Sequence, residues 1–340
     1  MNWARQEFEG LELGDARRTQ RLIKLVEALS AQPTGSIPFA CEGWAETKAA
    51  YRLLDNLAVE WQEILEIHTQ RSVERMLGEA VVLCIQDTTE LDFTSQPGIA
   101  GLGRLSYEAQ HGLYVHPTLA VTPTGVALGV LDAWIWARKP KDQPDVKEST
   151  RWVEGYEIVA DLAETLPETR LVYVADREGD LRALIDAAAR RGTPTDWLIR
   201  SKHNRKTTTG EKLWARLAQS DPLGEVEFTL PAAPDRPARL VRQTLYRTVV
   251  TLPAHHGQPA VTVTAILARE EQPPAGEKAI EWRLLTHRTA ETLEAAVELI
   301  DGYRRRWLVE IFSGFGNPAA GSRPCNWVPW SGWNGLCSLT

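Results

Sequence analysis

Two short apolar runs, far apart in the chain, constrain its fold more than any other feature. The first spans Val81 to Gln86 and the second Arg170 to Ala175, and each is followed directly by an aspartate, Asp87 and Asp176. Runs of this length and composition are typical of strands buried on both faces, which occur in sheets that helices cover on both sides. We therefore expect a mixed α/β sheet.

The sequence around these two runs predicts the element order β-β-β-α-β-α-β, followed by an all-β insertion over residues 203–278 and then by a strand and a long helix. Pro/Gly-rich turns separate the strands of the insertion. The expected strands are Val81–Gln86, Tyr114–Val121, Val126–Trp136, Arg170–Ala175, Asp196–Arg200, Val226–Leu230, Arg239–Leu252, Ala260–Arg269 and Trp282–Thr286. The expected helices are Thr150–Glu164, Asp180–Arg191 and a last one from about Ala290 to Phe312.

Residues 1–75 have a helical pattern. Asp15 can cap a helix whose apolar residues, including Leu22 and Leu25, fall on one face, while Arg18 and Arg21 lie on the other. Such arginines are either a solvated helix face or contacts to the phosphates of DNA. We expect three parts: a helical domain over 1–75, an α/β domain over 76–312 and a disordered Trp/Gly-rich tail over 313–340.

The charge and cysteine content exclude some classes of protein. The chain has 38 basic and 45 acidic residues, a net charge of -7, so it is no polycationic tail protein, although a local basic surface could still bind nucleic acid. The four cysteines form no CxxC pair, which argues against a disulfide framework or a cysteine zinc site. Without an apolar leader or a membrane-length apolar stretch, we expect a soluble cytoplasmic protein.

Three carboxylates are the candidate catalytic residues. Asp87 and Asp176 would meet at one edge of the sheet if their strands are neighbours, because ligands gather at the carboxyl ends of strands. Either could instead form a turn or cap a helix. Glu310 shares a helix face with Tyr303 and Arg306, where it is either a third metal ligand or the partner in an intrahelical ion pair.

Three carboxylates without a histidine cluster favour a hard cation, Mg²⁺ or Mn²⁺. A pair of such ions stabilises both the attacking and the leaving oxygen in the cleavage of a phosphodiester. The same site can activate water or a 3′-hydroxyl, so these residues could support either hydrolysis or strand transfer.

Several motifs together resemble one family, and they extend over residues 2–312. These are Gln86–Thr89, Asp176–Asp180, Arg200–His203 and Tyr303-x-x-Arg306-x-x-x-Glu310, preceded by Leu13–Leu22, Glu42–Gly43 and Ala50–Arg52. The sequence is similar to the DDE transposases of the insertion-sequence-four family, the group that includes the transposase of transposon five.

This resemblance implies an RNase H-like catalytic domain in which Asp87, Asp176 and Glu310 bind two Mg²⁺ or Mn²⁺ ions. It implies end nicking, hairpin formation and resolution, and strand transfer, by a homodimer that binds transposon terminal inverted repeats and target DNA. It also implies DNA contacts from Arg18, Arg21, Arg200, Tyr303 and Arg306, and base stacking by Trp282.

The C-terminus departs from the family. A lysine expected seven residues after Glu310 is Asn317 here, and residues 313–340 contain no Asp, Glu, Lys or His. A reading-frame change near residue 313 would produce this tail and remove the family's dimerisation helices. We therefore expect weak or absent strand transfer. Two alternatives stay open: a non-catalytic protein that binds transposon ends or inhibits transposition, and an unrelated RNase H-like nuclease.

Overall fold

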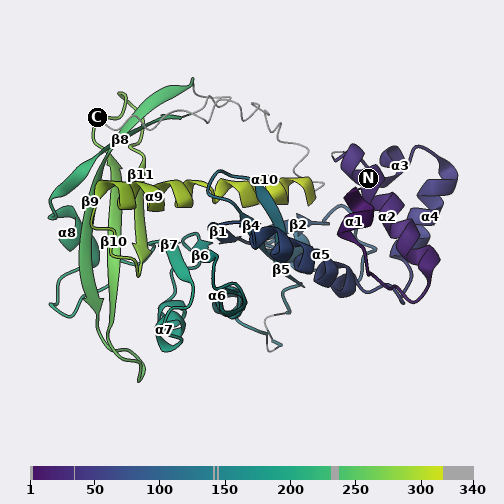
Figure 1. The fold of residues 1–340 in the computed structure, drawn as a ribbon, viewed down its shortest axis with the longest axis horizontal. Helices are drawn as coiled ribbons and strands as arrows, with labels where there is room; N and C mark the ends of the chain where they lie inside the picture. The colour runs from purple at the N-terminus through teal and green to yellow at the C-terminus, as the bar shows by residue number, and fades with distance from the viewer. Residues whose placement is uncertain (1–2, 34, 141, 144, 231–236, 317–340) are drawn as a thin grey trace.

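The computed structural model describes residues 3–33, 35–140, 142–143, 145–230 and 237–316. Within them, a helical unit formed by the N-terminal part of the chain lies beside a large mixed sheet with helices on both faces (Figure 1). The expectations about Asn317 and about residues 317–340 fall outside the described residues. Among those described, no helix is both long and apolar enough to cross a membrane.

The helical unit comprises α1 (Trp3–Glu7), α2 (Ala16–Ala31), α3 (Ile37–Ala40) and α4 (Trp44–Leu54). As predicted, Asp15 caps α2, since its side chain accepts a hydrogen bond of 2.9 Å from the backbone N–H of Arg17. Leu22 and Leu25 of α2 pack with Leu53 of α4 in a small separate core. The apolar spacing therefore produces the amphipathic helices that the sequence indicated.

The sheet has eleven strands, with the path β2-β4-β1-β6-β7-β11-β10-β9-β8, while β3 and β5 also pair with β4. The pairs β1–β6 and β6–β7 are parallel, and every other pair is antiparallel. The strands are β1 (Val81–Gln86), β2 (Thr89–Asp92), β3 (Gly103–Arg104), β4 (His111–Val121), β5 (Ala127–Trp136), β6 (Arg170–Ala175), β7 (Asp196–Arg200), β8 (Pro222–Leu230), β9 (Arg239–Leu252), β10 (Val261–Glu270) and β11 (Glu281–Thr286).

Helices cover both faces of the central strands. The core on one face includes residues of α6 (Glu148–Thr165), α7 (Arg182–Arg190) and α8 (Leu213–Ala218), and the core on the other includes residues of α9 (Leu293–Arg304) and α10 (Trp307–Gly316). Because β1 and β6 lie between these layers, nearly all of their side chains are buried. This double burial explains their continuous apolar sequences.

The expected all-β insertion over residues 203–278 is not all-β, because α8 lies within it, and its strands do not form a separate sheet. Its strands β8, β9 and β10 continue the main sheet beyond β11, which itself pairs with β7. The insertion therefore widens the main sheet on the side away from β4, as Figure 1 shows.

The expected single helix from Ala290 to Phe312 is wrong in two respects. The helix is broken at Arg305 and Arg306, which separate α9 from α10. It also runs on to Gly316, so residues 313–316 belong to the helix and not to the expected disordered tail. The break replaces helical hydrogen bonds with tighter turns, such as the 3.0 Å bond from the Arg306 N–H to the Tyr303 carbonyl. Glycine costs only about 1 kcal/mol in a helix, so Gly314 does not end α10.

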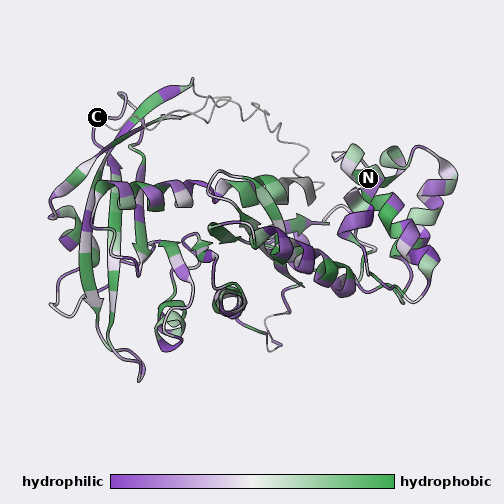
Figure 2. Ribbon diagram, viewed as in Figure 1, coloured by the Kyte–Doolittle hydropathy of each residue, from purple (hydrophilic) through white to green (hydrophobic). Residues whose placement is uncertain are grey.

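Helix α5 (Trp61–Met76) connects the helical unit to the sheet. Its first half contributes Ile64 and Ile67 to the N-terminal core, and its second half contributes Met76 to the core of the sheet. Consistent with this position, α5 alternates hydrophobic and hydrophilic residues along its length (Figure 2).

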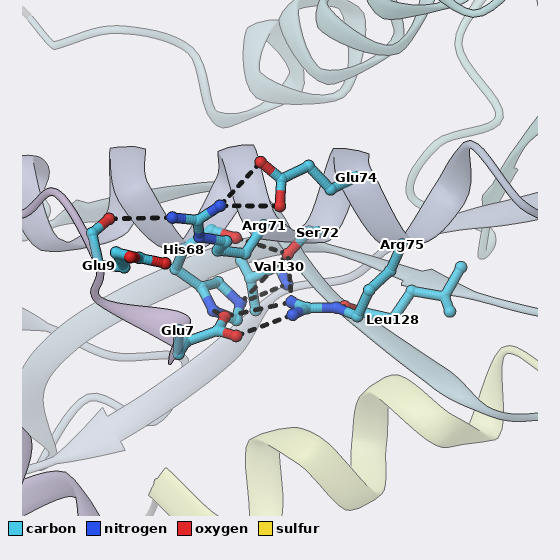
Figure 3. A network of polar contacts seen from close by, with 9 residues as sticks. All are labelled: Glu7, Glu9, His68, Arg71, Ser72, Glu74, Arg75, Leu128 and Val130. Carbon is cyan, nitrogen blue, oxygen red and sulfur yellow. Dashed lines mark hydrogen bonds and ion pairs between the residues drawn. The ribbon is translucent and has the colours of Figure 1, made fainter. Parts of the chain in front are cut away.

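A polar network reinforces this junction (Figure 3). The Glu7 carboxylate of α1 accepts hydrogen bonds from Arg75 Nη1 at 2.8 Å and from His68 Nδ1 at 2.6 Å. His68 Nε2 accepts from the backbone N–H of Val130 at 2.9 Å, and Arg75 Nε donates to the Leu128 carbonyl at 2.5 Å. The network therefore ties α1, α5 and β5 together.

Candidate active site

Asp87 and Asp176 lie at the same edge of the sheet. Strands β1 and β6 are parallel, and Ile85 is paired with Val174. Two residues further along both strands, the same register places Asp87 beside Asp176. Backbone N–H groups hold both carboxylates: Thr88 donates to Asp87 Oδ1 at 2.9 Å, and Glu178 donates to Asp176 Oδ1 at 2.7 Å. Both side chains thus have fixed positions at the carboxyl ends of buried strands.

Glu310 reaches the same place from the other end of the chain through Arg306. Arg306 Nη1 donates to Asp87 Oδ2 at 2.6 Å, and its Nη2 donates to Glu310 Oε1. The guanidinium group therefore bridges a carboxylate at the end of β1 and a carboxylate on α10. The expected ion pair between Arg306 and Glu310 exists and is shared with Asp87, but it is not intrahelical, because Arg306 lies just before α10.

The electrostatics indicate that the three carboxylates share one site. Burial raises the pKa of Asp87 to about 6; Arg306 opposes this shift, while the negative charges of Asp176 and Glu310 add to it. Burial alone would lower the pKa of Arg306, but Asp87, Tyr303 and Glu310 raise it above its ordinary value. Arg306 is therefore fully charged and serves as the counter-ion of this acidic edge.

Tyr303 and Arg200 flank this cluster. The Tyr303 side chain is buried, and burial raises the pKa of its hydroxyl, against the opposing effect of Arg306 and Arg200. Within the described part of the chain, its buried hydroxyl makes no hydrogen bond of good geometry. Arginines can only donate to this hydroxyl, so its own proton is available to a further acceptor, such as a phosphate oxygen.

Trp282 of β11 lies next to Tyr303 of α9. Its ring stacks on Phe228 of β8 with centroids 5.7 Å apart and is 6.4 Å from the Tyr303 ring. The Arg304 guanidinium lies over the Phe228 ring, 4.6 Å from its centroid. Trp282 is half-buried, so part of its ring is accessible beside the candidate site.

Arg18 and Arg21 belong to the helical unit and not to the carboxylate cluster. Arg18 Nη1 donates to the Leu13 carbonyl at 2.9 Å, and Arg21 forms an ion pair with Glu46 of α4. Both arginines therefore have partners within the helical unit, and their contact with DNA stays a prediction.

Sequence reasoning missed two groups that support the site. Asp180 is fully buried, and its Oδ2 accepts hydrogen bonds from the backbone N–H groups of Lys202 and His203, at 2.6 and 2.8 Å. It thereby fixes the loop after Arg200. Its place in the motif Asp176–Asp180 was a signal that could have identified it.

The second group is His116 of β4, whose Nδ1 lies 2.5 Å from the Thr88 hydroxyl, beside Asp87. Burial, with help from the positive charge of Arg151, lowers the pKa of His116 to about 3, so the imidazole is neutral. No sequence pattern distinguishes this histidine from an ordinary strand residue.

The carboxylates of Asp87, Asp176 and Glu310 are the type of ligand that a hard cation prefers, but they are not arranged as a metal site in this structure. Carboxylate oxygens are the ligands that Mg²⁺ and Mn²⁺ prefer. Nevertheless, within the described ranges no group of three His, Cys, Asp or Glu residues is placed so that it could hold a metal ion. Arg306 is hydrogen-bonded to two of the three carboxylates, which accounts for the disagreement.

Two comparisons with known proteins concern DNA transposition. Residues 1–59, which contain α1 to α4, match the family of transposase DNA-binding domains. Among solved structures, the chain is similar to the piggyBac transposase in a cryo-EM synaptic complex with hairpin DNA. That similarity has a TM-score of 0.43 and 9% sequence identity, and it covers 87% of this chain and 57% of the other. The match thus spans less than two thirds of that transposase and is too weak to assign a fold family.

Proposed function

We propose that this protein is a DNA transposase of the DDE class, with Asp87, Asp176 and Glu310 as its catalytic carboxylates. The observation that carries the proposal is the convergence of these residues, which come from β1, β6 and α10, on one edge of the sheet. The match of residues 1–59 to transposase DNA-binding domains supports the same class of protein independently.

The order of the central strands supports an RNase H-like core in this proposal. An antiparallel pair, β5 and β4, lies next to the parallel strands β1, β6 and β7, and helices cover both faces. The finer assignment to the insertion-sequence-four family rests on the motifs at the site. Divalent ions, when bound, would stabilise the charge that develops on the attacking and leaving oxygens of the phosphodiester.

The surroundings of the carboxylates suit a DNA end. Tyr303 and Arg200 provide a hydroxyl and a guanidinium for phosphate oxygens, and the half-buried Trp282 offers a ring on which a base can stack. The helical unit would bind the terminal inverted repeats through Arg18 and Arg21. Pairing of two ends would require a homodimer, which stays a prediction.

Cleavage of a defined substrate tests the proposal. The full chain would be incubated with Mg²⁺ and a plasmid carrying the inverted repeats that flank its gene. We expect nicks at the ends of the repeats, loss of nicking in Asp87→Asn and Asp176→Asn, and unchanged binding of the repeats. Asp221→Asn is the matched control, because it removes an exposed carboxylate before β8. Nicking that survives both substitutions would refute the catalytic assignment.

One alternative has an observation in its favour. The family match is confined to the first 59 residues, and Arg306 bridges two of the carboxylates. Both facts also suit a protein that binds transposon ends without cutting them. In that case the repeats would be bound with the same affinity by the native protein and by Asp87→Asn, and neither would nick the plasmid.

A further inference from the structure

Arg306 bridges the carboxylates of Asp87 and Glu310 with its positive charge. One terminal nitrogen donates to Asp87 Oδ2 at 2.6 Å and the other to Glu310, so a single side chain uses one oxygen of each carboxylate. Only 13% of the Arg306 side chain is exposed. A metal ion cannot use these same oxygens fully while the guanidinium group remains there.

The location of Arg306 in the chain allows the side chain to move without moving a helix. It lies in the two-residue break between α9 and α10, and its long side chain makes the contact to Asp87 across the gap. Tyr303 and Arg200, one turn back and on β7, border the same cluster. A phosphate placed by these two groups would give the guanidinium a second, doubly hydrogen-bonded partner.

We propose that Arg306 is an exchangeable internal counter-ion, which occupies the carboxylate site until a DNA phosphate takes over its guanidinium group and so admits the divalent ion. This inference rests on the proposed function for the identity of the phosphate. The competition between Arg306 and the metal ion is a property of the chain alone. Because binding free energies are reciprocal, DNA binding raises metal affinity by the same factor as metal binding raises DNA affinity.

A fixed structural ion pair would behave in the opposite way. If Arg306 only gathered Asp87 and Glu310 into place, its removal would scatter the carboxylates and weaken metal binding. If it competes for their oxygens, its removal leaves three carboxylates without their counter-ion and strengthens metal binding. The sign of the change in metal affinity therefore separates the two roles.

The first experiment titrates the DNA-free protein with Mn²⁺ and measures free Mn²⁺ by electron paramagnetic resonance. We expect Arg306→Met to bind Mn²⁺ about tenfold more tightly than the native protein, within the usual range of coupling between sites. Arg306→Lys keeps the charge and should stay near the native affinity. An unchanged or weaker affinity in Arg306→Met would overturn the proposal.

A neighbouring arginine provides the matched control. Arg304→Met removes a positive charge two residues away that pairs with Asp301 and covers Phe228, and it should leave Mn²⁺ affinity as in the native protein. A similar gain in both methionine variants would mean that net charge alone sets the affinity, which would also overturn the proposal. Circular dichroism would confirm that each variant is folded.

A second measurement needs no disruptive variant. In the native protein, Mg²⁺ should shift the Nε–Hε resonance of Arg306, assigned by its loss in the conservative Arg306→Lys protein. The shift should saturate together with Mg²⁺ binding. Binding of Mg²⁺ without any change at this resonance would show that the guanidinium does not leave the carboxylates.

A third experiment measures DNA binding with a fluorescent duplex that carries the flanking inverted repeat. Ca²⁺ replaces Mg²⁺ in order to prevent cleavage. We expect Ca²⁺ to tighten duplex binding about fivefold or more in the native protein, and much less in Arg306→Met. An equal gain in both proteins would exclude the coupling. If the protein never cleaves DNA but Arg306→Met binds Mn²⁺ more tightly, the proposed function fails and the competition between Arg306 and the metal ion stands. If the protein cleaves DNA but Arg306→Met does not bind Mn²⁺ more tightly, the competition fails and the proposed function stands.

Discussion

At the scale of single residues, Asp87 combines burial with three nearby charges. Its pKa is raised to about 6, above the value of about 3.9 expected in the unfolded chain. A raised carboxyl pKa contributes stability that is fully present below the unfolded pKa and is lost as the pH rises through the folded pKa. Between pH 4 and pH 6 the free energy of unfolding should therefore fall because of this group.

Asp87→Asn removes the ionisable carboxyl and with it the loss of stability at neutral pH, which provides a direct test. In EDTA at pH 7.5, we expect the variant to be more stable than the native protein by about 3 kcal/mol. At pH 4 the difference should nearly vanish, because the native carboxyl is then protonated. Urea unfolding at both pH values measures the change, and an equal difference at pH 4 and 7.5 would contradict the assigned shift.

The Thr88 hydroxyl is the second residue-scale feature with a measurable effect. It is the partner of His116 Nδ1, while His116 Nε2 has no hydrogen-bond partner within the described residues. Thr88→Val would leave both ring nitrogens buried without a partner, at a cost of about 1–3 kcal/mol. Thr88→Ser keeps the hydroxyl and should be nearly neutral in the same urea unfolding experiment. Equal destabilisation by both substitutions would point to packing instead.

At the scale of elements, the sequence predicted the buried strands best. Both Val81–Gln86 and Arg170–Ala175 have the predicted bounds, because burial on two faces demands an apolar run that turn residues end. The break at Arg305 and Arg306 could not be predicted, since no glycine or proline marks it. It coincides with the ion pair from Arg306 to Asp87, which is a contact between distant parts of the chain.

The packing of α6 against β1 has a sharp steric limit at Gly155. A Cβ atom there would overlap the amide of the buried Gln86, which accepts a hydrogen bond from the Tyr173 hydroxyl. Gly155→Ala should therefore destabilise the protein by about 1–3 kcal/mol, although alanine alone favours a helix. Gly302→Ala in α9 is the control: its nearest neighbours would be 3.7 Å away.

The two alanine variants should change the free energy of unfolding in opposite directions. Gly302→Ala should stabilise the protein by up to about 1 kcal/mol, since it meets only ordinary van der Waals contacts in a helix interior. Thermal unfolding of the two variants beside the native protein measures both effects. A stabilising Gly155→Ala would mean that α6 can move away from β1 at little cost.

At the scale of the whole molecule, part of the candidate site follows from topology. Parallel pairing of two apolar strands is enough to bring Asp87 and Asp176 together, which sequence reasoning anticipated. The bridge from Arg306 to Asp87 depends on how α9 and α10 cross the sheet, and nothing in the local pattern specifies that crossing. The roles of Trp282, Arg200 and Tyr303 toward DNA stay predictions for a different reason, because they concern a partner and not the fold.

The junction between the helical unit and the sheet depends on Glu7. Burial alone would raise its pKa, but the positive charge of Arg75 and the hydrogen bonds from Arg75 and His68 lower it, so Glu7 is charged at neutral pH (Figure 3). Glu7→Gln removes the charge and leaves Arg75 without its carboxylate partner. We expect a loss of about 1–3 kcal/mol, because breaking one side of a partly buried pair is costly.

The loss should be local to the junction, which hydrogen exchange can detect. In Glu7→Gln, amides of α1 and of the α5 turn around His68 should exchange faster, while those of β1 and β6 keep their protection. Glu74→Gln is the control on the same helix, since the pair of Glu74 with Arg71 is more exposed and worth at most about 1 kcal/mol. Faster exchange throughout the sheet would instead mean that the helical unit and the sheet unfold as one cooperative unit, with Glu7 acting on both.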